Sequence, residues 1–283
     1  MSNLLYALPE NLIYFLYICE DNIMRKMTCF LACCVLLLLV NTAHGQSDET
    51  RQAILHGKAL LAEATSLQDR EGMQEARQLF DTLKRDPSVA ALAYYYAGYA
   101  SYRLSTFLPR TQTDERMAYL NEAVADLETA IQKQGDLADA YTLLDRCYGL
   151  QIDIDHSLGQ TLGEVGEVYR AHALQLAPDN PRVLFLSGAG LYFTPPEYGG
   201  DPQLAMEHFE QAAQLFETQT PSDPLLPDWG HAEVYAWIGQ GYLIQNPEEA
   251  HAALTKALTL DPDYRWVKER LLPQAEAQLK KQP

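Results

Sequence analysis

The stretch from Tyr235 to Pro262, YAWIGQGYLIQNPEEAHAALTKALTLDP, carries the pattern that decides the fold. Two segments of this stretch place small or large apolar residues at spacings of four and three, which puts them on one face of a helix. Asn246 and Pro247, a typical helix start, lie between the two segments. The stretch therefore predicts two helices joined by a short turn, each buried on one side. The positions that carry the pattern are Tyr235, Ile238, Gly239 and Tyr242 in the first segment and Ala250, Leu254 and Ala257 in the second.

The same two-helix pattern recurs along the chain. From the last packed position of one unit to the tight position of the next, the distance is 15 residues in three cases (98 − 83, 145 − 130 and 188 − 173). A glycine inside a helix costs about 1 kcal/mol, so glycines at tight positions indicate close approach of two backbones. In the first unit, Ala64 takes the tight position. The third unit is the weakest match, because Gly166 and Arg170 replace its small and large residues. The clearest second-helix repeats are Ala76/Phe80/Leu83, Ala123/Leu127/Ala130 and Ala205/Phe209/Ala212.

This pattern resembles the tetratricopeptide repeat (TPR) family, whose unit of about 34 residues carries an aromatic, Leu-Gly, Tyr, Ala, Phe, Ala, Pro signature. The resemblance covers roughly residues 54–264 and is closest in the last unit, which ends on Pro262. It implies an all-α, TPR-like helix-turn-helix solenoid of about five units, with enlarged turns inside units and a C-terminal capping helix. The Gly199-Gly200-Asp201 turn also resembles secreted TPR proteins of the TRAP-transporter-associated lipoprotein type, although the lipid-acceptor cysteine of that type is missing.

The N-terminal residues predict export. Arg25 and Lys26 precede the apolar run Cys29–Val40, and a small-residue end follows at Ala43 and Gly45. This order is typical of a secretory signal peptide, and the run is too short to span a bilayer. We therefore expect translation to start at Met24, cleavage after Gly45, and a single mature domain over residues 46–283 in the periplasm or outside the cell. We expect no membrane span in that mature chain.

The net charge and the absence of catalytic motifs disfavour several classes of function. The formal net charge is −17, which disfavours nucleic acid and anionic membranes as partners. The sequence has no GxSxG, HExxH, P-loop or GxGxxG motif, so we expect no enzyme activity and no cofactor. Asp153, Asp155 and His156 lie close together and form either a solvated turn or a metal or acid/base group. A catalytic site there is the weaker of the two interpretations.

The TPR resemblance implies which residues line the concave groove. In that family, groove residues lie six and three positions before the tight position, and one and four after it. Rigid aromatic side chains beside arginines suit an apolar body with a carboxylate. The alternative is that the aromatic residues pack against neighbouring helices and that each arginine pairs with an acidic side chain. The predicted groove residues are Leu92, Tyr95, Tyr99, Tyr102, Arg146, Arg182, Phe185 and Tyr192.

The stretch FTPPEYGGDPQLA, from Phe193 to Ala205, concentrates helix breakers in one turn. Its glycines can take positive φ, Asp201 can cap a helix, and Pro202 fits the first helical turn. These residues predict the end of one helix and the start of its partner. Turn chemistry explains most of the motif, and it leaves Phe193 and Tyr198 in an apolar loop that can act as a lid.

Three functions fit these observations. The first is a secreted or periplasmic scaffold that holds a protein or peptide in its groove. The alternative is a binding protein for a small organic ligand, an apolar body with a carboxylate, that serves a transport system. That alternative predicts an enclosed aromatic pocket instead of an open trough. The third is a metal-assisted enzyme that uses Asp153, Asp155 and His156.

Overall fold

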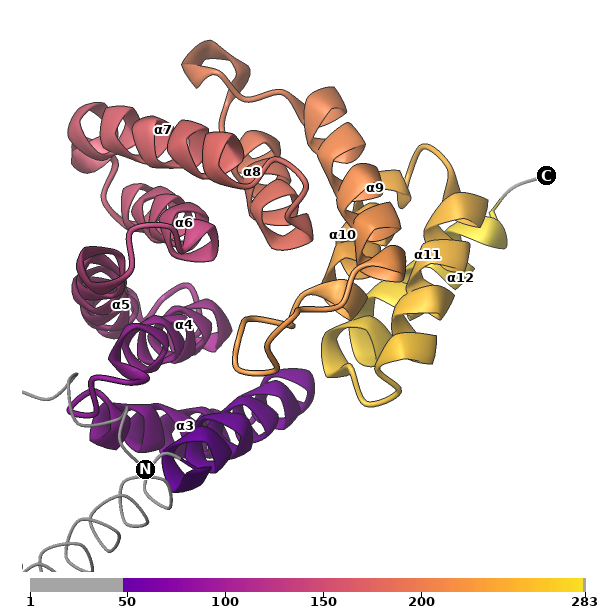
Figure 1. Cartoon of the computed structure of the whole chain (residues 1–283). Helices are drawn as coiled ribbons and strands as arrows, with labels where there is room; N and C mark the ends of the chain where they lie inside the picture. Colours follow the sequence, from indigo (N-terminus) through magenta and orange to yellow (C-terminus); the bar gives the residue numbers. More distant parts are fainter. Residues whose placement is uncertain (1–47, 282–283) are drawn as a thin grey trace, which may run out of the picture. The chain divides into compact units, whose positions relative to one another are not determined.

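The computed structural model describes residues 48–281, and every regular element in that range is a helix. The chain divides into two compact units, Met1–Glu49 and Thr50–Pro283, and the helices below belong to the second. From α4 to α11, consecutive helices pair closely, and the pairs follow one another (Figure 1). The predicted all-α, solenoid-like fold is therefore confirmed. The pairs are residues 50–67 with α3 (Arg70–Leu83), α4 (Ala90–Phe107) with α5 (Thr113–Lys133), α6 (Ala138–Ile154) with α7 (Gly159–Leu176), α8 (Pro181–Phe193) with α9 (Pro202–Thr218), and α10 (His231–Tyr242) with α11 (Pro247–Leu260).

Within each of three pairs, a glycine on the first helix lies against the large residue of the second. A Cβ atom added at Gly188 would lie 2.9 Å from the Phe209 ring and 3.0 Å from the Ala205 carbonyl oxygen. Corresponding short contacts involve Gly98 with Leu127, and Gly239 with Leu254. The predicted close approach of paired helices is therefore confirmed at these glycines. In the first pair, Gly57 makes this contact with Phe80, and Ala64, at the predicted tight position, lies against Gly72 of α3.

The third pair replaces this apolar contact with an ion pair. Asp145 occupies the glycine position of α6, and Arg170 occupies the large position of α7, with 3.6 Å between Arg170 Nη1 and Asp145 Oδ2. A Cβ atom at Gly166 would lie 2.6 Å from Asp145 Oδ1, so glycine is needed there to make room for the carboxylate. Burial raises the pKa of Asp145 to about 6, and the Arg170 guanidinium opposes that rise. This exchange explains why the third unit departs from the repeat pattern.

The turn between α8 and α9 has the predicted construction. Gly199 has φ of 90°, the left-handed region that favours glycine. Gly200 passes so close to Thr194 that a Cβ atom there would lie 1.7 Å from the Thr194 carbonyl oxygen. The Asp201 carboxylate accepts hydrogen bonds from the N–H groups of Gln203 and Leu204, and Pro202 is the first residue of α9. The breakers therefore end one helix and begin the next.

Two other Asx-Pro pairs start helices in the same way, and two do not: Asp261 ends α11, and its carboxylate accepts a hydrogen bond from the Asp263 N–H. Asn180 and Asn246 cap α8 and α11 through their side-chain oxygens. Asp86 instead accepts hydrogen bonds from the backbone N–H and hydroxyl of Ser88, and α4 begins only at Ala90. The Asp86-Pro87 pair therefore forms a turn ahead of α4 and does not cap the helix.

The enlarged turn expected inside the second unit is not found, because the extra residues of this pair lie in its helices. Helices α4 and α5 have 18 and 21 residues, and a short connection over residues 108–112 joins them. A long turn, residues 194–201, is found between α8 and α9. After α11 the chain forms the π-helical turn η4 (Val267–Leu271) and then α12 (Leu272–Leu279), which pack on α11 as the predicted cap. Pro273 at the start of α12 cannot donate a helical hydrogen bond, and this accounts for the π turn before it.

Predictions about export fall on other residues. The start at Met24, the apolar run Cys29–Val40 and the cleavage after Gly45 lie outside the described residues. Within residues 48–281, no helix combines the length and the hydropathy needed to cross a bilayer. Cys147 is a buried free thiol, and burial raises its pKa well above its usual range.

We expect Gly188→Ala to lower the free energy of unfolding by about 1–3 kcal/mol, because its Cβ atom would press on Phe209 and the backbone of α9. The matched control is Gly163→Ala in α7, where nothing lies within 4 Å of the added Cβ atom. That change should raise stability by about 0.5–1 kcal/mol through helix propensity. Urea unfolding followed by circular dichroism measures both, and equal effects of the two substitutions would contradict the close-approach role of Gly188.

We expect Arg170→Met to destabilise the protein by about 3 kcal/mol at neutral pH, because it leaves Asp145 buried without its cation. A carboxyl group whose pKa is higher in the folded than in the unfolded state stabilises less as pH rises through that range. The variant should therefore lose more stability at about pH 8 than at about pH 4.5. Urea titrations at both pH values test this. Arg265→Met, which removes an exposed pair with Glu269, should cost less than about 1 kcal/mol at either pH.

Candidate functional site

Residues 219–230, which connect α9 to α10, fold back onto the inner face of the helix pairs (Figure 1). We call them the inner segment. Lys58, from the helix of residues 50–67, donates hydrogen bonds to the carbonyl oxygens of Pro224 and Leu226 at 2.5 and 2.6 Å. The same ammonium lies 3.1 Å from the Asp228 carboxylate, and the Lys58 side chain is only 7% exposed. One buried lysine therefore fixes three points of the inner segment.

Trp229 joins the inner segment to α4 and α8. Its indole stacks on Tyr99 with ring centroids 4.5 Å apart, and it meets the Phe185 ring edge-on. The indole N–H donates a 3.0 Å hydrogen bond to the Tyr95 hydroxyl. Tyr96 donates its hydroxyl proton to the Leu225 carbonyl oxygen at 2.8 Å. The tyrosines of α4 therefore bind a segment of this same chain.

A buried ion pair lies at the other edge of the indole. Arg103 of α4 pairs with Glu233 of α10, and its Nε donates to the Tyr99 hydroxyl at 2.9 Å. The guanidinium carbon lies 5.1 Å from the Tyr99 ring centroid and 6.0 Å from that of Trp229. Both partners are about nine-tenths buried. This pair joins the second helix pair to the fifth across the inner face.

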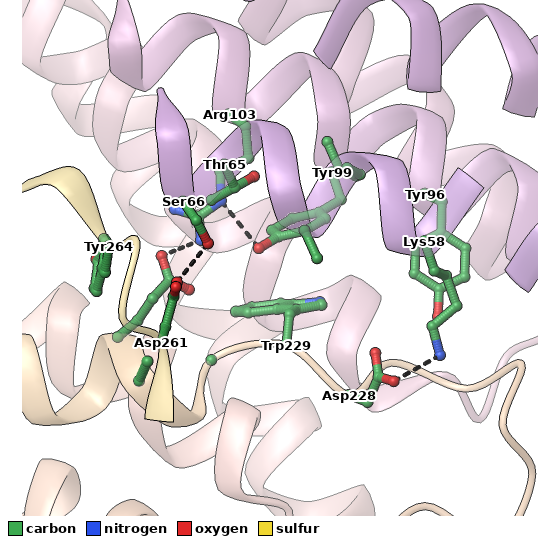
Figure 2. A pocket seen from close by; sticks show the side chains of 15 residues that line it. Lys58, Thr65, Ser66, Tyr96, Tyr99, Arg103, Asp228, Trp229, Asp261 and Tyr264 are labelled. Carbon is green, nitrogen blue, oxygen red and sulfur yellow. Dashed lines mark hydrogen bonds and ion pairs between the residues drawn. The ribbon is translucent and has the colours of Figure 1, made fainter. Parts of the chain in front are cut away.

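These contacts leave a half-open cavity of about 280 Å³ between residues 50–67, α4, the inner segment and the start of α10. Figure 2 shows Trp229 lying flat against Tyr99, with the Lys58–Asp228 pair on one side and Ser66 bonded to Asp261 on the other. The cavity is lined by Lys58, Leu61, Ala62, Thr65, Ser66, Tyr96, Tyr99, Arg103, Asp228, Trp229, Gly230, Ala232, Glu233, Asp261 and Tyr264.

Burial shapes the electrostatics of this cavity. It lowers the pKa of Lys58, and the Asp228 carboxylate partly opposes that shift. Burial also raises the pKa values of Tyr96, Tyr99 and Tyr264 well above their usual range, so these hydroxyls stay protonated and can donate. The cavity therefore presents aromatic walls, neutral hydroxyls, and charges that already have partners.

The predicted groove residues divide between two places. Tyr95, Tyr99 and Phe185 gather around Trp229, with Tyr102 stacked on Tyr99. Leu92 is half-buried against the hydrophobic core.

A second group lies between the middle of α6 and the C-terminal end of α8. There the Arg146 guanidinium lies over the Phe193 ring, and Tyr192 contacts Phe193. Tyr198, the other predicted lid residue, is 79% exposed on η3 (Pro196–Tyr198), away from the cavity lining.

Arg182 is not available as a ligand anchor in this arrangement. Its Nε donates to the Asp139 carboxylate, which also accepts a 2.7 Å hydrogen bond from the Asn180 side chain. Arg182 and Asp139 are both buried. Arg182 also lines a second cavity of about 400 Å³, where Asn180, Phe216 and His231 are further lining residues. Asp228 lines both cavities, so the inner segment borders each of them.

Four residues of this site were not among the predicted groove residues: Lys58, Arg103, Trp229 and Glu233. Arg103 follows Gly98 by five positions, outside the groove spacing of the family. Trp229 lies in the insertion that lengthens the step between the fourth and fifth units. Trp229 could have been recognised from the composition of that insertion, PSDPLLPDWG. There, three prolines accompany Leu225, Leu226 and Trp229. Apolar side chains in a proline-rich connection indicate burial of the connection.

The acidic turn after α6 has a structural role in this arrangement. Asp155 accepts hydrogen bonds from the Ser157 N–H and hydroxyl and caps the short helix η2 (His156–Leu158). Asp153 lies 3.7 Å from the Arg116 guanidinium. Among residues 48–281, no cluster of three or more His, Cys, Asp or Glu side chains has the arrangement needed to hold a metal ion.

The chain is similar in fold to a solved structure, but it matches no family model and no curated protein. Among solved structures, the chain is similar to the HusA haemophore from Porphyromonas gingivalis, with 22% sequence identity and a TM-score of 0.52. The similarity covers 69% of this chain and 92% of the haemophore. At this identity the likeness concerns the fold.

We expect Lys58→Met to release the inner segment, because three interactions with Pro224, Leu226 and Asp228 are lost together. A hydrogen bond to a charged group contributes about 1.5–3 kcal/mol, so amide exchange in residues 219–230 should accelerate at least about tenfold. Hydrogen exchange with mass spectrometry measures this. Lys256→Met is the control, since Lys256 pairs only with the exposed Glu217 and Tyr235. Unchanged protection in Lys58→Met would contradict the anchoring role.

Proposed function

We propose that this protein is a non-catalytic, exported binding protein whose inner face takes a small organic ligand in the cavity beside Trp229. The observation that carries this proposal is the position of the inner segment. It covers the tyrosines of α4 that a groove-bound peptide would contact, and it leaves a bounded cavity of about 280 Å³. The small-ligand alternative predicts an aromatic pocket and the peptide scaffold requires an open trough, and the half-open aromatic cavity is nearer to the pocket.

A peptide bound along the inner face would have to displace the inner segment. That exchange breaks the Trp229–Tyr99 stack, the hydrogen bonds of Tyr95 and Tyr96, and the contacts of Lys58. A peptide would recover those interactions only by imitating the inner segment. A protein or peptide partner in the groove is therefore the weaker of the two proposals, and it predicts a large gain in exchange of residues 219–230 on binding.

The cavity lining indicates the ligand class. Tyr96, Tyr99, Trp229 and Tyr264 offer flat apolar surfaces to a compact molecule with a ring or similar body. The paired charges of Lys58 and Arg103 favour a ligand that exchanges hydrogen bonds with them over one that brings a large net charge. One structural neighbour is a haemophore, so haem belongs among the candidates. The lining has no His, Cys or Met side chain, so Tyr96, Tyr99 or Tyr264 would have to hold the haem iron.

Two further features agree with binding instead of catalysis. Cys147 is buried and its pKa is raised by burial, which makes it a poor nucleophile. The Asp153–His156 turn caps a short helix and pairs with Arg116. We also propose that the helix pairs are TPR-like units, on the basis of the glycine contacts that recur from pair to pair.

The test begins with native mass spectrometry of protein purified gently from its own compartment. We expect a reproducible small-molecule adduct, and we expect Ala62→Phe to abolish it. Ala62 is exposed and lines the cavity, so a phenyl ring there can fill the opening without burying a new group in the core. Ala171→Phe, at an exposed position on α7, is the control and should keep the adduct. A bare mass with a co-eluting protein, or an adduct that survives in Ala62→Phe, would contradict the proposal.

A further inference from the structure

Arg146 is a buried arginine without an acceptor. It lies on α6, is only 8% exposed, and its Nε atom is buried with no hydrogen-bond partner. Among the residues that the structure describes, no carboxylate or carbonyl oxygen forms a hydrogen bond or ion pair with its guanidinium. Arg146 does not line the cavity beside Trp229, so the proposed function gives it no role.

The other buried arginines show what is missing. Arg103 pairs with Glu233, and Arg182 pairs with Asp139. Arg116 donates to the Ser105 carbonyl oxygen and lies 3.7 Å from Asp153. In each case, burial of the guanidinium is offset by oxygen atoms of the same chain. A buried cation without acceptor oxygens destabilises a protein. Such a cation is retained where a bound anion supplies the oxygens.

The described neighbours of Arg146 supply no acceptor to its guanidinium. The guanidinium carbon lies 5.5 Å from the centroid of the Phe193 ring. A Cβ atom at Gly149 would lie 3.5 Å from Nη1, so the neighbouring turn of α6 passes close to the guanidinium without supplying an acceptor. The adjacent acid, Asp145, is paired with Arg170 on α7, and the Arg146 charge also opposes the rise of the Asp145 pKa without forming a hydrogen bond or ion pair with it.

An apolar surface adjoins this guanidinium. Phe193 is 48% exposed, and its ring meets Tyr192 and Trp237 edge-on at centroid distances of 5.3 and 5.2 Å. Exposed aromatic rings beside a buried cation suit a ligand with an apolar body and one anionic end. A single cation in a chain of net charge −17 favours a monoanion over a phosphate dianion.

We propose that Arg146 binds the carboxylate of an organic acid through a paired hydrogen-bond contact, and that the apolar body of the acid lies against Phe193 and Tyr192. This site is separate from the cavity beside Trp229, and it extends the binding function to a second position on the inner face. Arg146 is a binding residue in this proposal, and Phe193 is a wall of the site.

The test uses 2-naphthoate as the probe and 2-naphthamide as its uncharged counterpart. In wild-type protein, calorimetry should show at least about tenfold tighter binding of the naphthoate, the difference that one charge-assisted contact supplies. Arg146→Met should remove that preference and leave naphthamide binding unchanged. Arg146→Lys, which keeps the charge and loses the planar fork, should retain part of it. Arg110→Met, at an exposed arginine, is the control and should bind as wild type.

Two direct measurements locate the effect. The arginine Hε signal that disappears in Arg146→Met should shift in wild-type protein when naphthoate is added. Without ligand, Arg146→Met should keep or raise the Tm, because it removes a buried charge that has no acceptor. A clear fall in Tm, an unmoved Hε signal, or equal naphthoate binding by wild type and Arg146→Met would overturn the proposal.

Ala62→Phe separates this inference from the proposed function. Naphthoate binding that persists in Ala62→Phe and is lost in Arg146→Met supports a distinct carboxylate site. Naphthoate binding that is lost in Ala62→Phe and persists in Arg146→Met overturns the role of Arg146 and leaves the cavity proposal intact.

Discussion

The stack of Trp229 on Tyr99 is the contact on which the inner face depends. It lets residues 219–230 lie inside the curve of the helix pairs, where a connection would ordinarily leave backbone groups without partners. Lys58 and Tyr96 satisfy three carbonyl oxygens of this segment. Pro221, Pro224 and Pro227 bring no N–H groups, so burial of the segment leaves fewer donors to satisfy. Aromatic stacking and proline composition therefore act together to make an interior connection stable.

The helix pairs themselves could be predicted from local sequence. Gly98, Gly188 and Gly239 lie where the repeat spacing predicted close contact, and each meets the large residue of its partner helix. The pattern also marked the third unit as an exception, but the cause of that exception could be found only in the structure. Asp145 and Arg170 are 25 positions apart (170 − 145), and their pairing depends on how α6 and α7 lie against each other. The spacing of residues shows which face of a helix is buried, but it does not show which side chain of the partner helix packs against that face.

The site could be predicted only in part, for the same reason. The groove spacing selected Tyr95, Tyr99 and Phe185, which do gather at one place, but it gave no sign of what covers them. Their partner Trp229 is 134 positions away from Tyr95, and Lys58 is 166 away from Pro224. Contacts of that range leave no periodic trace in a single sequence. The same spacing selected Arg146 and Arg182 together, and their different surroundings, one with Asp139 and one without an acceptor, emerge only from the fold.

The contacts across the inner face also change how this array of helix pairs is held together. In an open repeat array each unit contacts only its neighbours, so the ends can fray while the middle stays folded. Here Lys58 near the beginning holds Pro224, and Ser66 is bonded to Asp261, 195 positions later. Links of such sequence separation slow folding, because distant parts of the chain must meet before they form. They also tie the first pair to the last, so the units gain mutual protection from local unfolding and lose the independence that lets repeat proteins grow or shrink by whole units.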